Sequence, residues 1–255
     1  MQDRYVGDVG DFGKYGLLRA LLSPLENAPA LRIGVVWYLV PDERANGDGS
    51  RVGYLSLPPN RAAAFRDCDP VLFDTMQRLV ADGQRNVKSV SRASVLPEGT
   101  VFYERLLDFT DLPRTGAARR EYRSTWLRDA CRLTAQSDLV FLDPDNGLGN
   151  SVAAHRKQGV KYAYIDELKA FLERGKAVIV YHHIGRQCGA REQIARQFSR
   201  LGLKDEESAF ALLYHRGTAR SFFVIEPRGG KYRLLDRAMN MLSGAWLRHF
   251  ELVLP

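Results

Sequence analysis

The sequence predicts an α/β protein with a mainly parallel, Rossmann-like sheet, helices on both faces and a C-terminal antiparallel hairpin. Short apolar runs alternate with segments of helical periodicity, which is typical of a parallel sheet covered by helices. Residues 139–142 are Leu-Val-Phe-Leu, an uninterrupted apolar run that indicates a strand buried on both faces. Two further apolar runs, 209–214 and 221–225, are joined by a short connection that suits a hairpin better than a helical crossover.

The first element expected along the chain is a loop that feeds a short helix. Glycine occupies every third position from Gly7 to Gly16, and because glycine is costly inside a helix, we expect the helix only from Lys14 to Leu22. Leu31 to Val40 is the first strand, and Pro41 stops it. The other expected elements are helices over 70–81, 113–135, 162–174 and 191–201, and strands over 100–107, 139–142, 176–181, 209–214, 221–225 and 231–235.

Size and composition are those of an ordinary globular protein. The chain has 255 residues, of which 45% are hydrophobic and 26% charged. We find no linker or repeat and expect a single α/β domain over residues 1–255, to which residues 41–135 contribute an inserted helical or loop subregion. No apolar run is long enough to span a bilayer and no signal-peptide core follows Met1, so we expect no membrane partner and a cytoplasmic location. Cys68, Cys131 and Cys188 form no CxxC pair, which argues against a disulfide framework or a thiolate zinc site.

The charge balance is compatible with a polyanionic partner. The formal net charge is +7, and phosphates attract Lys and Arg without any sequence readout. The helix expected over 113–135 is rich in arginine, so it is either a solvated amphipathic helix or a surface that contacts a nucleic-acid backbone. The arginines of that candidate surface are Arg119, Arg120, Arg123, Arg128 and Arg132.

Polar residues directly follow the central strand over 139–142. Asp143, Asp145 and Asn146 come at its carboxyl end, where open α/β sheets bind ligands. His182 and His183 follow the next strand, and we expect Asp143 and His182 to emerge side by side into one hollow. The alternatives without function are a turn-forming or helix-capping role for Asp143 and a packed or loop-bonded role for the histidines.

Two other acidic stretches are candidates for contact with a ligand. Asp8, Asp11 and Lys14 lie in the glycine-rich N-terminal stretch, where backbone can approach a ligand closely. Asp42 and Asp48 lie in the turn-rich loop after the first strand. Solvated charges and a plain exposed connection are the alternatives.

The order of elements and the Asp-Pro pair resemble the S-adenosylmethionine-dependent methyltransferase superfamily. The last two strands of its Rossmann-like sheet form a hairpin, and its fourth strand ends in an acidic or amide residue followed by proline. Residues 143–146, Asp-Pro-Asp-Asn, stand where many nucleic-acid N-methyltransferases carry Asp/Asn-Pro-Pro-aromatic. The chain departs from that pattern at Asp145 and Asn146, and no GxG motif follows Val40.

This resemblance implies an enzyme that uses S-adenosylmethionine and acts on a nucleic acid or a nucleotide-like substrate. Asp143 would position or deprotonate the acceptor, and Asp145 and Asn146 would complete its hydrogen bonding. His182 or His183 would act as a base or an orienting group. The residues expected near the cofactor or substrate are Asp8, Asp11, Lys14, Asp42 and Asp48.

Two other functions remain open. Residues 143–148 also look like the Asp-x-Asp-Asn-Thr-Leu signature of haloacid-dehalogenase-type phosphatases, with Gly147 in place of threonine. That likeness implies a phosphoesterase or nuclease in which Asp143, Asp145 and His182, or alternatively His183, hold Mg²⁺ or Mn²⁺. The signature usually opens its domain, however, and here only 105 residues follow Asn150. The third hypothesis is a noncatalytic module that binds nucleic acid through the arginine-rich helix.

Overall fold

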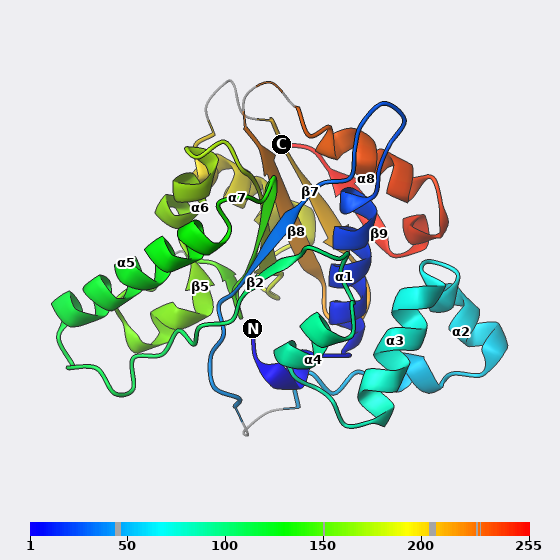
Figure 1. The fold of residues 1–255 in the computed structure, drawn as a ribbon, viewed down its shortest axis with the longest axis horizontal. Helices are drawn as coiled ribbons and strands as arrows, with labels where there is room; N and C mark the ends of the chain where they lie inside the picture. Colours follow the sequence, from blue (N-terminus) through cyan, green and yellow to red (C-terminus); the bar gives the residue numbers. More distant parts are fainter. Residues whose placement is uncertain (44–46, 150, 204–207, 228, 230) are drawn as a thin grey trace.

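A mixed β-sheet runs through the centre of the molecule (Figure 1). The computed structural model describes residues 1–43, 47–149, 151–203, 208–227, 229 and 231–255. Within these residues the sheet has seven strands in the order β2-β1-β3-β6-β8-β7-β9. The strands are β1 (Ile33–Trp37), β2 (Val101–Tyr103), β3 (Leu139–Asp143), β6 (Ala177–His183), β7 (Ser208–Tyr214), β8 (Arg220–Glu226) and β9 (Phe250–Val253).

The sheet has a parallel half and an antiparallel half. Strands β2, β1, β3 and β6 are mutually parallel, whereas β8 runs antiparallel between β6 and β7, and β9 runs antiparallel to β7. The predicted α/β class and the hairpin, formed by β7 and β8, are confirmed. A separate small sheet pairs β4 (Gly147–Leu148) with β5 (Tyr162–Ala163).

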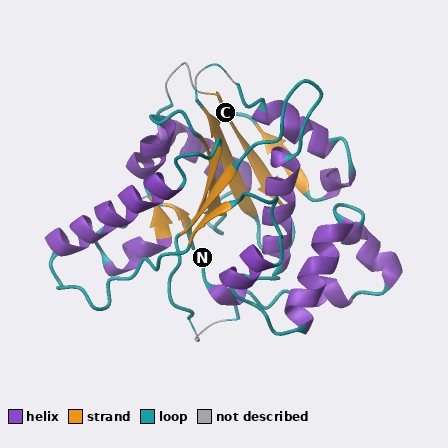
Figure 2. Cartoon of the chain, in the orientation of Figure 1, coloured by secondary structure: helices purple, strands orange, loops and turns teal. Residues whose placement is uncertain are grey.

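Helices cover both faces of the sheet, as Figure 2 shows. One face packs against α1 (Val9–Leu22), α3 (Pro70–Ala81) and α8 (Leu234–Leu242), and the other against α5 (Gly116–Leu133), α6 (Ile165–Leu172) and α7 (Ala190–Leu201). The predicted subregion over 41–135 contains α2 (Pro59–Arg66), α3 and α4 (Val87–Arg92), while the single-domain organisation stays a prediction. The short 3₁₀ helices are η1 (Asp3–Tyr5), η2 (Gly53–Ser56), η3 (Lys157–Lys161) and η4 (Ala245–Arg248).

Alternation along β3 divides the core into two clusters. Leu139 and Phe141 belong to the cluster beneath α1 and α8, whereas Val140 and Leu142 belong to the cluster beneath α5 and α6. Asp143 continues the first set, so its side chain lies on the α1 side of the sheet. This alternation determines which polar side chains at the carboxyl ends of the strands lie on the same face of the sheet.

The predicted loop over residues 7–13 is wrong, because α1 already begins at Val9 and contains three of the glycines. A Cβ atom at Gly13 would lie 2.5 Å from the ring of Tyr214, and one at Gly16 would lie 2.1 Å from the ring of Trp246. The glycines therefore form a flat helix face that packs directly against the C-terminal part of the chain. Close packing of aromatic rings offsets the helical cost of glycine.

The strand expected over 231–235 is also wrong. Glu226 ends β8, and its carboxylate accepts hydrogen bonds from the backbone N–H groups of Tyr232, Arg233 and Leu234. These bonds satisfy the unpaired donors at the start of α8, so the segment turns into a helix.

Among the described residues, no helix combines the length and the apolar character needed to cross a bilayer.

Candidate functional site

A cavity of about 620 Å³ lies at the carboxyl ends of β3 and β6. Parallel strands end at the same edge of a sheet, and β7 also points this way, so the turn that joins it to β8 reaches the same edge. The start of α1, loop residues 47–51, residues 143–146, the residues after β6 and the turn over 217–220 contribute to the lining. The expectation of a pocket at the end of the central strand is therefore confirmed.

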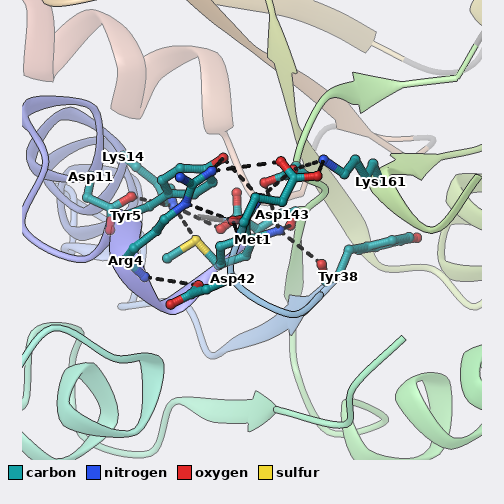
Figure 3. Close-up of polar contacts among 12 residues, drawn as sticks. Met1, Arg4, Tyr5, Asp11, Lys14, Tyr38, Asp42, Asp143 and Lys161 are labelled. Atoms are coloured by element: carbon teal, nitrogen blue, oxygen red, sulfur yellow. Dashed lines mark hydrogen bonds and ion pairs between the residues drawn. The ribbon is translucent and has the colours of Figure 1, made fainter. Parts of the chain in front are cut away.

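A buried lysine bridges two carboxylates on one side of this cavity. Lys14 Nζ lies 2.7 Å from Asp11 Oδ1 and 2.8 Å from Asp143 Oδ2, and Figure 3 shows the three side chains pointing toward one another from α1 and β3. All three side chains are at most 5% exposed. Burial alone would lower the pKa of Lys14, but the two carboxylates raise it above its ordinary value. Lys14 is therefore a fixed cation.

Asp11 titrates closer to neutral pH than an ordinary carboxyl group. Burial raises its pKa to about 6, although the ammonium of Lys14 opposes the rise. Its second oxygen, Oδ2, is buried and has no hydrogen-bond partner. Asp11 thus offers an unused acceptor atom with a pKa close to neutrality.

Asp145 lies at a second buried charge cluster beside the N-terminus. The Met1 ammonium donates to the backbone oxygens of Tyr38 at 2.9 Å and Asp143 at 3.2 Å, and lies 3.9 Å from Asp145 Oδ1. Gln2 Nε2 donates to Asp145 Oδ2 at 3.0 Å. Burial would raise the pKa of Asp145, but the Met1 ammonium and Lys161 lower it below its ordinary value. Asp145 is therefore ionised, and its Oδ1 has no hydrogen-bond partner.

A further set of lining residues is cationic and meets the carboxylates where Arg220 lies beside Asp8. Arg220 Nη2 donates to Thr218 Oγ1 at 3.1 Å and lies 3.5 Å from Asp8 Oδ1, while its Nη1 is buried without a hydrogen-bond partner. Arg51 and Arg186 also line the cavity, and neither forms an ion pair with a described residue. The cavity therefore has a carboxylate-rich side and a guanidinium-rich side.

The structure does not bring His182 into the cavity, so the expected pairing of Asp143 with His182 is wrong. Leu142 pairs with Val180, which places Asp143 level with Tyr181 and sends the His182 side chain to the opposite face. There His182 Nδ1 accepts from the Leu148 N–H at 3.1 Å, and burial lowers the pKa of His182 to about 4. His182 is a neutral structural acceptor.

The remaining predicted site residues are divided between the cavity and its surroundings. His183, Asn146 and Asp48 line the cavity, and Asp8 does so while capping α1 through Gly10 N–H. Asp42 is exposed, accepts from the Arg4 N–H at 3.3 Å and does not line the cavity.

The arrangement does not fit the alternative metal site. The described part of the chain has no group of three or more His, Cys, Asp or Glu side chains placed to hold a metal ion. The ammonium of Lys14 already lies between Asp11 and Asp143, and His182 faces away. Asp143, Asp145 and His182 therefore do not form a common Mg²⁺ or Mn²⁺ site.

Only some of the arginines of the arginine-rich helix α5 are exposed to solvent. Arg123 is buried, with Nε 2.6 Å from Glu167 Oε1, and its other nitrogens donate to backbone oxygens, so this residue is not available to a nucleic acid. Arg119 is half-buried, whereas Arg120, Arg128 and Arg132 are exposed.

Several cavity residues were not predicted. Tyr181 could have been found from the alternation along β6, which places it on the Asp143 side of the sheet. Arg186 and Arg220 flank predicted strands, but nothing in their own positions distinguished them from solvated charges. The contribution of Met1 and Gln2 depends on how the N-terminal segment folds back, for which the sequence carries no periodic signal.

Comparison with models of known protein families finds no match, and comparison with curated proteins finds no significant match.

Proposed function

We propose that this chain is a methyltransferase-like enzyme that binds S-adenosylmethionine and acts on a nucleotide-like acceptor in the cavity beside Asp143. The observation that carries the proposal is the convergence of unpartnered buried polar atoms on one cavity. Asp11 Oδ2, Asp145 Oδ1 and Arg220 Nη1 all belong to residues that line it. Buried polar atoms normally have hydrogen-bond partners, and a small rotation of these side chains toward a ligand in the cavity would supply them. The hairpin beside β6 agrees with the resemblance to this superfamily.

The residues present fit the chemistry of the cofactor. S-adenosylmethionine carries an ammonium group and ribose hydroxyls, and both kinds of donor satisfy carboxylate oxygens such as Asp11 Oδ2 and Asp145 Oδ1. The volume of about 620 Å³ lies within the range of small-molecule sites, roughly 300–1,000 Å³. When bound, the cofactor supplies the methyl group.

The chain's own residues would orient the acceptor and take up its proton. Asp143, at the end of β3, would position the acceptor or take up its proton. Lys14 holds Asp11 and Asp143 in place, so the nucleophile meets a fixed carboxylate. Asn146 and Asp145 supply further hydrogen bonds from the loop after β3. In this scheme Asp143 acts on the acceptor and Asp11 helps to hold the cofactor.

Calorimetric titration with S-adenosylmethionine and with its demethylated product tests the proposal. We expect micromolar binding to the wild type and at least about tenfold weaker binding to Asp11→Asn, because a charged hydrogen-bond acceptor is lost. Asp111→Asn is the matched control, since Asp111 is exposed and lies outside the cavity. It should bind like the wild type.

Absence of binding of either compound at millimolar concentration would overturn the proposal. Equal binding by wild type and Asp11→Asn would also contradict it, because the cofactor would then occupy another place. Melting temperatures of both variants identify any loss that comes from unfolding.

A further inference from the structure

We propose that Arg51, Arg186 and Arg220 form a phosphate subsite, and that the acceptor is therefore a mononucleotide rather than a nucleoside or a nucleic-acid duplex. This inference names the substrate class of the proposed enzyme and in that respect rests on the proposed function. The phosphate subsite depends on the arginines and the cofactor site on the carboxylates, so an experiment can reject one proposal and retain the other.

The first step is the distribution of paired and unpaired charge around the cavity. Lys14 is fully engaged by Asp11 and Asp143, and the Met1 ammonium lies beside Asp145. The cations of the carboxylate-rich side are therefore already compensated by carboxylates of the protein.

The guanidinium-rich side lacks this compensation. Asp8 is the acid nearest to Arg220, but its oxygens also accept from the backbone N–H groups of Gly10 at 2.8 Å and Arg51 at 3.0 Å. Neither the Arg51 nor the Arg186 side chain has a carboxylate partner within the described part of the chain. Three guanidinium groups thus stand against the carboxylates of Asp8 and Asp48 in this part of the lining, which leaves a surplus of one positive charge.

The second step is geometry at the turn between β7 and β8. A Cβ atom at Gly217, whose φ is +76°, would lie 3.1 Å from Arg51 Nη1, so the Arg51 guanidinium packs against this turn. In the next residue, Thr218 Oγ1 accepts from Arg220 Nη2 at 3.1 Å. One short turn therefore brings two guanidinium groups and a hydroxyl together at the cavity wall.

Arg220 is held in place by the glycine face of α1. A Cβ atom at Gly10 would lie 1.6 Å from Arg220 Nη1, so glycine at this position leaves room for the guanidinium. The same Nη1 is buried and lacks a hydrogen-bond partner. Arg220 is thus fixed at the cavity wall between α1, Thr218 and the Tyr181 hydroxyl, as a preformed anion site requires.

The third step is the chemistry of the ligand. Guanidinium groups bind phosphate through paired N–H donors, and a fully ionised phosphate offers oxygens to more than one arginine. Asp143 and Asn146, which the proposed function assigns to the acceptor, present oxygens that accept from the hydroxyl and amine groups of a nucleoside. A 5′-mononucleotide combines both chemistries in one molecule.

Calorimetry with paired ligands tests the subsite. The probes are the four common ribonucleoside 5′-monophosphates, the four matching nucleosides and inorganic phosphate. We expect at least one nucleotide to bind at least 30-fold more tightly than its nucleoside. Arg51→Gln and Arg186→Gln should each weaken that nucleotide at least tenfold and leave nucleoside binding unchanged. Arg196→Gln, an exposed control on α7 outside the cavity, should have no effect.

Three results would overturn the inference: equal affinity for nucleotide and nucleoside, no effect of Arg51→Gln and Arg186→Gln, or binding of a duplex oligonucleotide more tightly than any mononucleotide. Both arginines are exposed, so these variants should fold, and melting temperatures check this. Phosphate-dependent binding without binding of S-adenosylmethionine would retain the subsite and reject the proposed transfer reaction. Cofactor binding without phosphate dependence would retain the proposed transfer reaction and reject the phosphate subsite.

Discussion

Replacing Lys14 by methionine should destabilise the protein strongly at neutral pH. The substitution leaves Asp11 and Asp143 buried without the cation that now lies 2.7 and 2.8 Å from them. At an effective dielectric constant of about 20, each contact has a Coulomb energy of roughly 6 kcal/mol, most of which offsets desolvation. Breaking a buried ion pair from one side typically costs about 3–5 kcal/mol, and we expect that loss at pH 7.

The pH dependence of the same variant tests the cause of the loss. Without Lys14, the pKa of Asp11 rises further above its ordinary value of 3.8, because burial still acts and the compensating cation is gone. A carboxyl group with a raised folded pKa disfavours the folded state once it ionises, so stability should return as the pH falls from 7 to 5. Urea-induced unfolding at both pH values, followed by circular dichroism, measures this recovery.

A triple variant is the control for lost packing. Lys14→Met combined with Asp11→Asn and Asp143→Asn removes the uncompensated charges along with the lysine, so it should be more stable than the single variant at pH 7. The reasoning is refuted if the single variant loses less than about 1 kcal/mol, or if its loss is the same at pH 7 and pH 5.

Three further outcomes are expected from unfolding measurements. Gly16→Ala should lower the free energy of unfolding by about 1–3 kcal/mol, because the new Cβ overpacks the helix face. Gly53→Ala is the control and should lower it far less, since nothing lies within 4 Å of a Cβ at that position. Equal effects of the two substitutions would contradict the close packing of α1. Burial lowers the pKa of His182 from its ordinary 6.5 to about 4. As the pH falls, His182 is therefore protonated in the unfolded chain before it is protonated in the folded protein. Stability should fall by about 3 kcal/mol from this residue as the pH drops from 6.5 to 4, and His182→Gln should lack that component of the slope. Arg123→Met should cost about 3–5 kcal/mol and Arg120→Met under about 0.5 kcal/mol, and the reverse order would contradict the buried ion pair.

The fold was predictable because its strongest signals are local. The Leu-Val-Phe-Leu run became β3, the helical periodicity over 70–81 became α3 with the same bounds, and the short connection after Tyr214 became a hairpin. Each of these patterns depends on period and length within one segment.

The errors arose where a distant part of the chain decides the outcome. The glycines of α1 are costly in an isolated helix, but the rings of Tyr214 and Trp246 lie against them in the folded protein. The start of α8 depends on the carboxylate of Glu226 in another element. Helix and strand propensities, which are read from a short stretch of sequence, take account of neither contact.

A cavity does lie at the end of β3, where the candidate site was predicted, but the residues expected beside Asp143 were assigned from proximity in sequence. His182 was chosen because it follows the neighbouring strand, although alternate side chains of a strand face opposite ways. Tyr181 and His183 are the residues on the Asp143 side, and both line the cavity. The pairing of Asp143 with Lys14 depends on how α1 packs over the sheet, which no short-range pattern specifies.

The turn over residues 215–219 has a consequence for how this molecule could diversify. It joins β7 to β8 outside the hydrogen-bonded ladder, yet it supplies part of the cavity wall. Insertions or substitutions there would reshape the opening while the strand register beneath stays intact. Selection or design can thus alter selectivity at a single connection, provided that position 217 stays a glycine, because its φ is +76° and a Cβ there would lie within 3.1 Å of Val9 and Arg51.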